Sequence, residues 1–318
     1  MRGMRGLITG CAGFIGSHLV ESMLAEGDEI VGVDCFNDNY GRPQKLKNLE
    51  QAQQWEDFDF VPIDLSRGDL ESLVADCEIV FHLAAEPGVR KSWGARFEAY
   101  VRNNIVATQH LLEAMRAHPG RRLVLASSSS VYGQAECLPT PESAPPTPIS
   151  PYGATKLHSE QLADLYRVNF GLEVITLRYF SVYGPRQRPD MAFSIFLKNL
   201  LDGRPLELFG GDQTRDFTYV DDIVAATRKA GLVEVGGVFN IGGGSRVSLS
   251  HVLQLLEQIT GRPAEVRRTA PQTGDVRDTG ADISAASRAL GYSPSVPLED
   301  GLAAQWDWTV RSGSPMAG

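Results

Sequence analysis

The sequence predicts an α/β protein organised around a doubly wound parallel sheet, with a smaller α/β lobe toward the C-terminus. Three observations support this fold class. Apolar runs as short as residues 123–126 alternate along the chain with helical patterns. Glycines spaced as G-x-x-G-x-x-G follow the first apolar run and precede a helix. Hydroxyl side chains follow the run at 123–126, where the carboxyl ends of parallel strands bind ligands.

Length, composition and charge are those of an ordinary globular protein. The 318 residues suffice for one large α/β domain and a smaller lobe. A net charge of −9 argues against a nucleic-acid surface, which needs basic clusters. We see no signal peptide and no apolar run near the roughly 20 residues of a membrane span, so we expect a cytoplasmic protein with reduced cysteines. The cysteines and histidines lack metal-ligand spacing, so no metal is predicted.

The first element is a complete strand–helix–strand unit. Its first strand ends at residues 7–9, Gly10, Gly13 and Gly16 follow, and a helix opens immediately. The second strand ends in Asp34, 18 residues beyond Gly16, close to the roughly 20 expected for the acid that binds a ribose diol. The glycines let the backbone approach a pyrophosphate at the helix N-terminus. No arginine follows Asp34 directly, so the pattern predicts NAD rather than NADP. A glycine-rich turn without a cofactor is the alternative.

Two more strands and a long helix are expected before the hydroxyl-rich segment. Residues 35–57 are polar and predict a surface loop and a helix. Strands are expected at 58–63 and 79–83, and a helix at 100–115. Small residues follow the second of these strands and would let a cofactor lie against the backbone. We expect His82, within that strand, to be a packed residue rather than a catalyst.

The segment from residue 127 to 156 contains the candidate chemistry. It reads S-S-S-S-V-Y-G at 127–133 and, after a proline-rich stretch, S-P-Y-G-A-T-K at 150–156, where the Ser-Pro pair predicts a helix N-terminus. Tyr152 and Lys156 are four residues apart and share one helix face. A phenol with its pKa near 10 is a poor base at neutral pH, but a neighbouring ammonium favours the phenolate. A strand-end hydroxyl facing this pair would let Tyr152 take a proton from a sugar alcohol. The alternative is an ordinary amphipathic tyrosine and a solvated lysine.

The rest of the chain alternates strands and helices. The helix that begins at Pro151 should continue to Gly171. The remaining expected elements are a loop at 134–149, strands at 174–178, 206–209 and 238–241, a helix at 222–230, a helix at 249–259 capped by Ser248, and helices at 283–290 and 299–311.

Together these motifs resemble the extended short-chain dehydrogenase/reductase family, in its NAD-dependent sugar-nucleotide epimerase and dehydratase branch. The resemblance spans nearly the whole chain. It implies a Rossmann-type sheet of about seven strands, tightly held NAD, a UDP-sugar substrate and a homodimer formed through two helices per subunit. Residues 1–178, with a return at about 216–245, would form the NAD-binding domain. Residues 179–215 and 246–318 would form the sugar-nucleotide lobe.

The resemblance also implies residue roles. Tyr152 would take the proton of a sugar 4-hydroxyl, Lys156 would hold the nicotinamide ribose and lower the Tyr152 pKa, and Ser128 would bind the sugar oxygen. Asp64 would meet the adenine amino group, with a helix cap as the alternative. The full set of implied cofactor contacts is Gly10, Gly13, Phe14, Ile15, Gly16, Asp34, Asp64, Leu65, Leu83, Ala84, Ala85, Asn104, Ser127, Tyr152, Lys156 and Tyr179.

The serine segment distinguishes the branches of this family. Dehydratases carry an Asp-Glu pair after the hydroxyl residue, because eliminating water needs an added acid and base. Sugar-acid decarboxylases typically read T-S-E there. This chain has Ser129 and Ser130 at those places. A site without carboxylates favours an epimerase, which oxidises the sugar, rotates the 4-keto form and returns hydride to its other face.

Three segments resemble UDP-glucuronate 4-epimerases: P-G-V-R-K-S-W at 87–93, G-P-R-Q-R-P-D-M-A at 184–192 and G-D-V-R-D-T at 274–279. By this match Arg188 and Ser181 would hold the glucuronate carboxylate, and arginine suits a bidentate grip. A grip is needed because oxidation at C4 makes a β-keto acid, which loses CO₂ when the carboxylate bond aligns with the carbonyl π system. A diphosphate or surface contact is the alternative for Arg188.

The remaining implied contacts place Arg215 and Arg277 at the UDP diphosphate and Phe193 and Phe209 near the uracil. The full set of implied substrate contacts is Arg90, Ser128, Ser129, Ser181, Arg188, Ala192, Phe193, Phe209, Arg215 and Arg277. The prediction is therefore 4-epimerisation of UDP-glucuronate. The alternatives are a UDP-glucose or UDP-N-acetylglucosamine 4-epimerase, a UDP-glucuronate decarboxylase, and an idle NAD-binding module.

Overall fold

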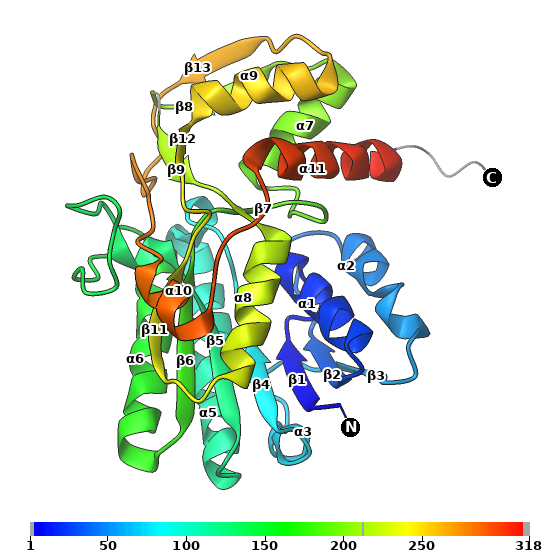
Figure 1. Ribbon diagram of the computed structural model, residues 1–318, viewed down its shortest axis with the longest axis vertical. Coiled ribbons are helices and arrows are strands. Elements are labelled where there is room, and N and C mark those ends of the chain that lie inside the picture. Colours follow the sequence, from blue (N-terminus) through cyan, green and yellow to red (C-terminus); the bar gives the residue numbers. More distant parts are fainter. Residues whose placement is uncertain (1–2, 212, 314–318) are drawn as a thin grey trace.

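A parallel seven-stranded sheet forms the centre of the protein (Figure 1). The computed structural model describes residues 3–211 and 213–313. The sheet order is β11-β6-β5-β4-β1-β2-β3, and every neighbouring pair is parallel. Its strands are β1 Arg5–Thr9, β2 Glu29–Asp34, β3 Phe58–Pro62, β4 Ile79–His82, β5 Arg122–Ser128, β6 Glu173–Tyr179 and β11 Gly237–Ile241. The predicted fold class is confirmed.

Helices cover both faces of this sheet. The helices α1 Phe14–Ala25 and α8 Val220–Leu232 share one face, and α5 Ala107–Ala117 and α6 Pro151–Phe170 share the other. Along β5, Val124 packs into the core on the α1 face, whereas Leu123 and Leu125 pack into the core on the α5 face. Burial on both faces explains why β5 reads as a continuous apolar run rather than an alternating one.

The boundaries of helix α6 follow from its sequence. Ser150 has extended backbone, and its hydroxyl accepts a hydrogen bond from the Gly153 N–H at 3.1 Å. Pro151 occupies the first turn, and Gly171 ends the helix with φ of +72°. The predicted start and end of this helix are confirmed. Helix α9, Leu249–Thr260, is likewise capped by the Ser248 hydroxyl, as predicted.

The long helix predicted before β5 is interrupted. It consists of α4 Phe97–Tyr100, a π-helical segment at Val101–Val106, and α5. Two hydroxyls, those of Thr108 and Ser159, donate to the Asn104 carbonyl at 2.6 and 2.8 Å. These bonds supply the carbonyl with hydrogen-bond donors other than the regular α-helical N–H. The sequence pattern did not predict this segment.

The chain between β6 and α8, and the chain after β11, form a second group of elements beyond the carboxyl ends of the sheet strands (Figure 1). Its helices are α7 Ala192–Asp202, α9 and α11 Leu298–Gly313, while α10 Ser284–Leu290 lies beside β11. Its strands pair as β7 Val182–Tyr183 with β10 Thr218–Tyr219, β8 Leu206–Phe209 with β13 Val266–Thr269, and β9 Thr214–Asp216 with β12 Arg246–Ser248. The smaller elements α2 Arg42–Leu49 and α3 Glu71–Ala75 complete the sheet domain. None of the helices in the described ranges has the length and apolar character to cross a membrane.

Candidate active site

A cleft of about 1130 Å³, open solvent included, runs along the carboxyl ends of the sheet strands. It extends from the end of β2 to the start of α6. The implied cofactor contacts that line it are Gly10, Gly13, Phe14, Ile15, Gly16, Asp34, Asp64, Leu65, Leu83, Ala84, Ala85, Ser127, Tyr152, Lys156 and Tyr179. Arg188, an implied substrate contact, also lines it.

The glycine turn is packed too closely for side chains. A Cβ on Gly10 would lie 2.9 Å from the backbone of Ala84, and Gly10 has φ of +71°. A Cβ on Gly16 would lie 2.1 Å from the Gly10 carbonyl oxygen. The turn therefore brings bare backbone and the N-terminus of α1 to the cleft wall, which suits a pyrophosphate.

The end of the cleft next to β2 contains a buried ion pair that the sequence did not predict. Asp34 accepts a hydrogen bond from the Phe36 N–H at 2.7 Å and lies 3.4 Å from the Lys45 ammonium. Lys45 also donates to the Asn37 side chain at 2.7 Å, and both residues line the cleft. Charge pairing with Asp34 explains how a lysine in a polar segment is buried.

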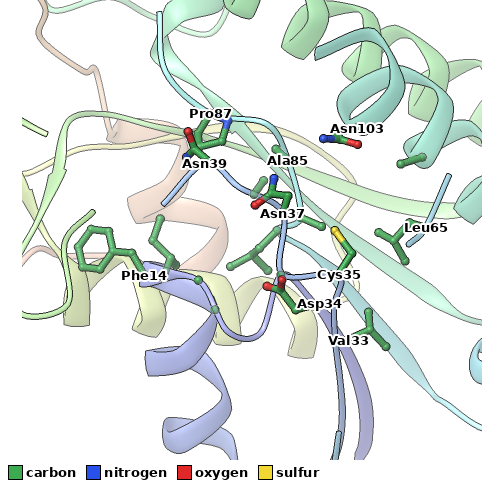
Figure 2. Close-up of a pocket in the computed structure, with 18 of the residues that line it drawn as sticks. Phe14, Val33, Asp34, Cys35, Asn37, Asn39, Leu65, Ala85, Pro87 and Asn103 are labelled. Carbon is green, nitrogen blue, oxygen red and sulfur yellow. The ribbon is translucent and has the colours of Figure 1, made fainter. Parts of the chain in front are cut away.

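Two asparagine side chains are held at the cleft by one buried carboxylate. Asn37 and Asn103 both donate to Glu86, at 2.9 and 3.1 Å. Figure 2 shows Asn37 beside the segment that contains Ala85 and Pro87. The predicted contact Asn104 is instead engaged with the backbone of Glu86 and the Thr155 hydroxyl, at 2.7 to 3.1 Å. The structure thus brings Asn103 to the cleft, one residue before the predicted position.

His82 and Asp64 occupy the places that the sequence suggested. The His82 ring is buried between the hydroxyls of Thr9 and Thr108, at 2.8 and 3.0 Å. Burial lowers the pKa of His82 to about 3, so it is neutral, and its prediction as a packed strand residue is confirmed. Asp64 lines the cleft and also accepts hydrogen bonds from the Ser66 N–H and hydroxyl, as a cap would.

Ser128 and Arg188 both act on the Tyr152 phenol. Burial raises the pKa of the Tyr152 phenol, while a hydrogen bond with Ser128 and the charge of Arg188 lower it. Ser128 is oriented by Ser130, whose N–H and hydroxyl both lie 3.1 Å from its oxygen. Arg188 is thus a cation that lowers the pKa of this phenol and that the sequence motif did not indicate for this role. The effect implied for Lys156 stays a prediction.

Lys156 lies one helical turn from Glu160, which belongs to a buried charge network. Burial lowers the pKa of Lys156 to about 8, and the carboxylate of Glu160, one turn along α6, raises it. Glu160 accepts hydrogen bonds from Ser127 and from Arg178, the latter at 2.7 to 3.3 Å. Arg178 also donates to the Tyr132 hydroxyl at 2.8 Å. The sequence motif indicated Lys156 and Ser127 but gave no sign of this network.

The loop that carries Arg188 is anchored to helix α1. Arg186 has a left-handed φ of +62°, and its guanidinium donates to both carboxylate oxygens of Glu21 at 2.8 and 3.0 Å. The Pro185 carbonyl lies 3.0 Å from Nε2 of His18. Burial, followed by the charge of Arg186, lowers the pKa of His18 to about 4, so the neutral ring donates this hydrogen bond. The strained backbone at Arg186 is thus held by two residues of α1.

A separate cluster contains four of the implied substrate contacts, which come from different segments of the chain: Arg90, Phe209, Arg215 and Arg277. The Arg90 guanidinium stacks 4.5 Å above the Phe209 ring and pairs with Asp275 at 2.8 Å. Arg215 donates to the carbonyls of Arg277 and Val276. Arg277 itself is exposed.

Four other implied substrate contacts lie outside that cluster. Phe193 packs in the core against Phe217, 4.6 Å between ring centroids, and against Tyr183. Its ring is 1% exposed, so the structure does not bring it to a ligand site. Ser181 follows β6 and accepts through its carbonyl from Thr218, while Ala192 begins helix α7. Ser129 is half-buried beside Ser128.

Comparisons with known proteins agree with this geometry. The sequence matches the model of the NAD dependent epimerase/dehydratase family over residues 6–242. A UDP-glucuronate 4-epimerase of Thermodesulfobacterium geofontis (strain OPF15) is 38% identical over 312 residues, which cover 96% of each chain. The Bacillus subtilis (strain 168) protein YtcB, described as an uncharacterized UDP-glucose epimerase, is 45% identical over 305 residues, which cover 94% of this chain and 96% of that protein.

A solved structure is similar over nearly the whole length. The UDP-glucuronic acid 4-epimerase from Bacillus cereus, crystallised with UDP-glucuronic acid and NAD, has a TM-score of 0.95 at 43% identity, covering 97% of this chain and all 100% of that chain. The family match extends over well more than half of the 318 residues. The protein therefore belongs to the NAD dependent epimerase/dehydratase family.

Proposed function

We propose that the protein is an NAD-dependent UDP-sugar 4-epimerase that converts UDP-glucuronate to UDP-galacturonate through a 4-keto intermediate. One observation supports this most directly: Arg188 lines the same cleft as Tyr152, close enough for its charge to act on the phenol. A fixed cation next to the base gives a sugar carboxylate a partner while the 4-hydroxyl faces Tyr152.

The chain supplies the acid–base and positioning groups. Bound NAD would supply the hydride acceptor and donor, and the glycine turn, Asp34 and the residues before α6 would hold it. The Tyr152 oxygen takes the proton of the 4-hydroxyl, and Ser128 donates a hydrogen bond to the sugar oxygen. Lys156 would hold the nicotinamide ribose. Reversal of the proton transfer after the 4-keto sugar has rotated gives the 4-epimer.

The serine segment supports epimerisation over the related reactions. Eliminating water or releasing CO₂ is helped by a carboxyl group beside the reacting carbons. Ser129 and Ser130 provide only hydroxyls there, and Ser130 is used to orient Ser128. The site can therefore transfer one proton at the 4-oxygen, but these positions supply no second acid for eliminating water or releasing CO₂.

UDP-glucose is the second candidate substrate. The Nε of Arg188 already has a carboxylate partner in Asp190 at 3.0 Å, so a neutral sugar would not leave this cation without a counter-ion. The similarity to the Bacillus subtilis UDP-glucose epimerase supports including it. UDP-N-acetylglucosamine belongs in the same test.

We also propose a cytoplasmic homodimer, and a division of labour within the chain. Residues 1–178 and about 216–245 would bind NAD, and residues 179–215 and 246–318 the nucleotide sugar. On α6, Leu165 and Val168 are 56% and 63% exposed, and an apolar helix face of this kind suits packing against a second copy. The mass of the protein in solution, measured by light scattering, should be twice 34.6 kDa. A monomer would refute the dimer.

Incubation with UDP-glucuronate, followed by NMR, tests the function. We expect UDP-galacturonate as the single product, approached from both directions to one equilibrium ratio. Parallel reactions with UDP-glucose and UDP-N-acetylglucosamine serve as controls. Conversion of either neutral sugar at a higher kcat/KM would replace UDP-glucuronate as the substrate, and a pentose with CO₂ would make the protein a decarboxylase.

A further inference from the structure

Asp190 holds Arg188 from one side. The Arg188 Nε donates to Asp190 Oδ1 at 3.0 Å, and Asp190 Oδ2 lies 3.3 Å from the Lys91 ammonium. Burial alone would raise the pKa of Asp190, but the charges of Arg188 and Lys91 lower it overall. Asp190 is therefore ionised at neutral pH, and the three side chains together carry one net positive charge.

The backbone beside this group lies in van der Waals range of the guanidinium and is held by a core residue. Gly88 has φ of +101°, which excludes most side chains, and a Cβ there would lie 3.8 Å from Arg188 Nη2. The buried Tyr100 hydroxyl lies within hydrogen-bond distance of both the Gly88 and Pro87 carbonyls, at 2.7 and 2.9 Å. The loop that faces the guanidinium is thus fixed by a core residue rather than by solvent.

The contact with Asp190 determines which donors of Arg188 remain. A guanidinium can grip a carboxylate through Nε and one Nη, or end-on through both Nη groups. Nε is occupied by Asp190, whereas neither Nη group has an acceptor within the described ranges 3–211 and 213–313. Since Arg188 lines the cleft, the free donors are those of the end-on fork.

We propose that Asp190 is a positioning residue for the substrate carboxylate. It presents Arg188 as a fixed end-on fork, and Lys91 balances the negative charge of Asp190. This inference rests on the function proposed above and adds residues to that site. A bound glucuronate would bring the local charge of the group to zero. Arg188 held at Nε cannot turn with the carboxylate, so it also fixes the torsion of the carboxylate bond.

That torsion decides whether the 4-keto intermediate survives. In decarboxylation, the C5–carboxylate bond breaks, its electron pair forms the C4–C5 enolate, CO₂ leaves and the enolate takes a proton at C5. The bond must align with the C4 carbonyl π system for this to occur. An Arg188 released from Asp190 would still attract the carboxylate but would not hold its direction. A pentose by-product is the specific sign of lost positioning.

Asp190→Ala, Asp190→Asn and Lys91→Met test the inference, with Asp202→Ala as the control, since Asp202 is a carboxylate on α7 that pairs with Lys198 and Arg204 instead. Asp190→Ala should raise the KM for UDP-glucuronate about tenfold or more, change kcat less, and yield a detectable pentose fraction by NMR. Binding of UDP-glucose, measured by calorimetry, should change by less than about threefold. Asp190→Asn, whose Oδ1 still accepts from Nε, and Lys91→Met should show smaller effects in the same direction.

The outcomes separate this inference from the proposed function. Unchanged KM and no pentose in Asp190→Ala, with both altered in Arg188→Ala, would overturn the positioning role and leave the function intact. If Asp190→Ala does not fold, the same readouts in Asp190→Asn and Lys91→Met decide. If the unaltered protein neither converts UDP-glucuronate nor binds it more tightly than UDP-glucose, both the function and the positioning role are overturned.

Discussion

Replacing Glu160 by glutamine would perturb the charge network next to Lys156, one of the proposed catalytic residues, while preserving the shape of the side chain. The Glu160 and Arg178 side chains are 7% and 6% exposed, and they are joined by contacts of 2.7 to 3.3 Å. The substitution removes the carboxylate charge and leaves the guanidinium buried without a counter-ion. Removing one partner of a buried ion pair costs about 3–5 kcal/mol. Glutamine keeps one acceptor oxygen, so we expect about 3 kcal/mol, the lower end of that range.

The corresponding change in melting temperature can be worked out from chain length. With an unfolding entropy of roughly 2.1 cal/mol/K per residue and 318 residues, 3 kcal/mol is a fall of about 4–5 °C in Tm. The double variant Glu160→Gln/Arg178→Met removes both charges and should lose less than the sum of the single variants. Calorimetry at one fixed NAD concentration measures all three, because bound ligand shifts Tm.

The same substitution should alter the pH profile of turnover. Lys156 has a pKa of about 8 and is therefore charged at lower pH, and the Glu160 carboxylate stabilises that charge. Turnover that needs the ammonium therefore falls as pH rises through about 8, and in Glu160→Gln the fall should begin at a lower pH. The network does not have this role if Glu160→Gln costs less than about 1 kcal/mol of stability, if the double variant loses the full sum of the single variants, or if the alkaline limb of the pH profile does not move.

Three further predictions concern the catalytic groups. Tyr152→Phe should lower kcat by about 10²–10⁴-fold and leave NAD bound; turnover close to the wild-type rate would remove Tyr152 from the base role. Arg188→Ala should weaken UDP-glucuronate binding by about 2–5 kcal/mol and UDP-glucose binding far less, as calorimetry would show; equal weakening would refute the carboxylate contact. A Cβ on Gly153 would lie 2.4 Å from the Ser130 carbonyl oxygen, so Gly153→Ala should displace Tyr152 from Ser128. About a 100-fold loss of kcat with unchanged circular dichroism is expected, and wild-type kinetics would contradict it.

The sheet was predictable from sequence because its strands and helix ends have local signals. Strand β5 is an apolar run buried on both faces, and α6 has a serine cap, a proline in its first turn and a glycine at its end. Each of these features depends on residues adjacent in the chain. The order of such elements then constrains the topology, because strands joined by helices form parallel sheets.

Apart from β8, which was predicted at 206–209, the short strands of the second group of elements were not predictable in the same way. Strand β13 is exposed along its whole length and reads Val-Arg-Arg-Thr, without an apolar alternation. It forms by pairing with β8, a segment about 60 residues earlier in the chain. The π-helical segment before α5 likewise depends on hydroxyls from Thr108 and from Ser159 on another helix.

The candidate site likewise contains residues that local sequence signals predicted and residues that only tertiary contacts bring there. Residues at the carboxyl ends of strands, such as Asp34 and Ala84, line the cleft as their positions predicted. Lys45 and Asn103 also line it, although only tertiary contacts with Asp34 and Glu86 bring them there. Conversely, the family resemblance implied that Phe193 lies near the uracil, but the structure packs its ring into the core.

The central claim is that the C4 hydrogen leaves the sugar and returns to the opposite face within one active site. Incubation with UDP-glucuronate deuterated at C4, in ordinary water, tests this most directly by NMR. We expect UDP-galacturonate that retains deuterium at C4 and carries none elsewhere. Loss of the label to solvent, or a sugar whose configuration at C4 is not inverted, would contradict this mechanism.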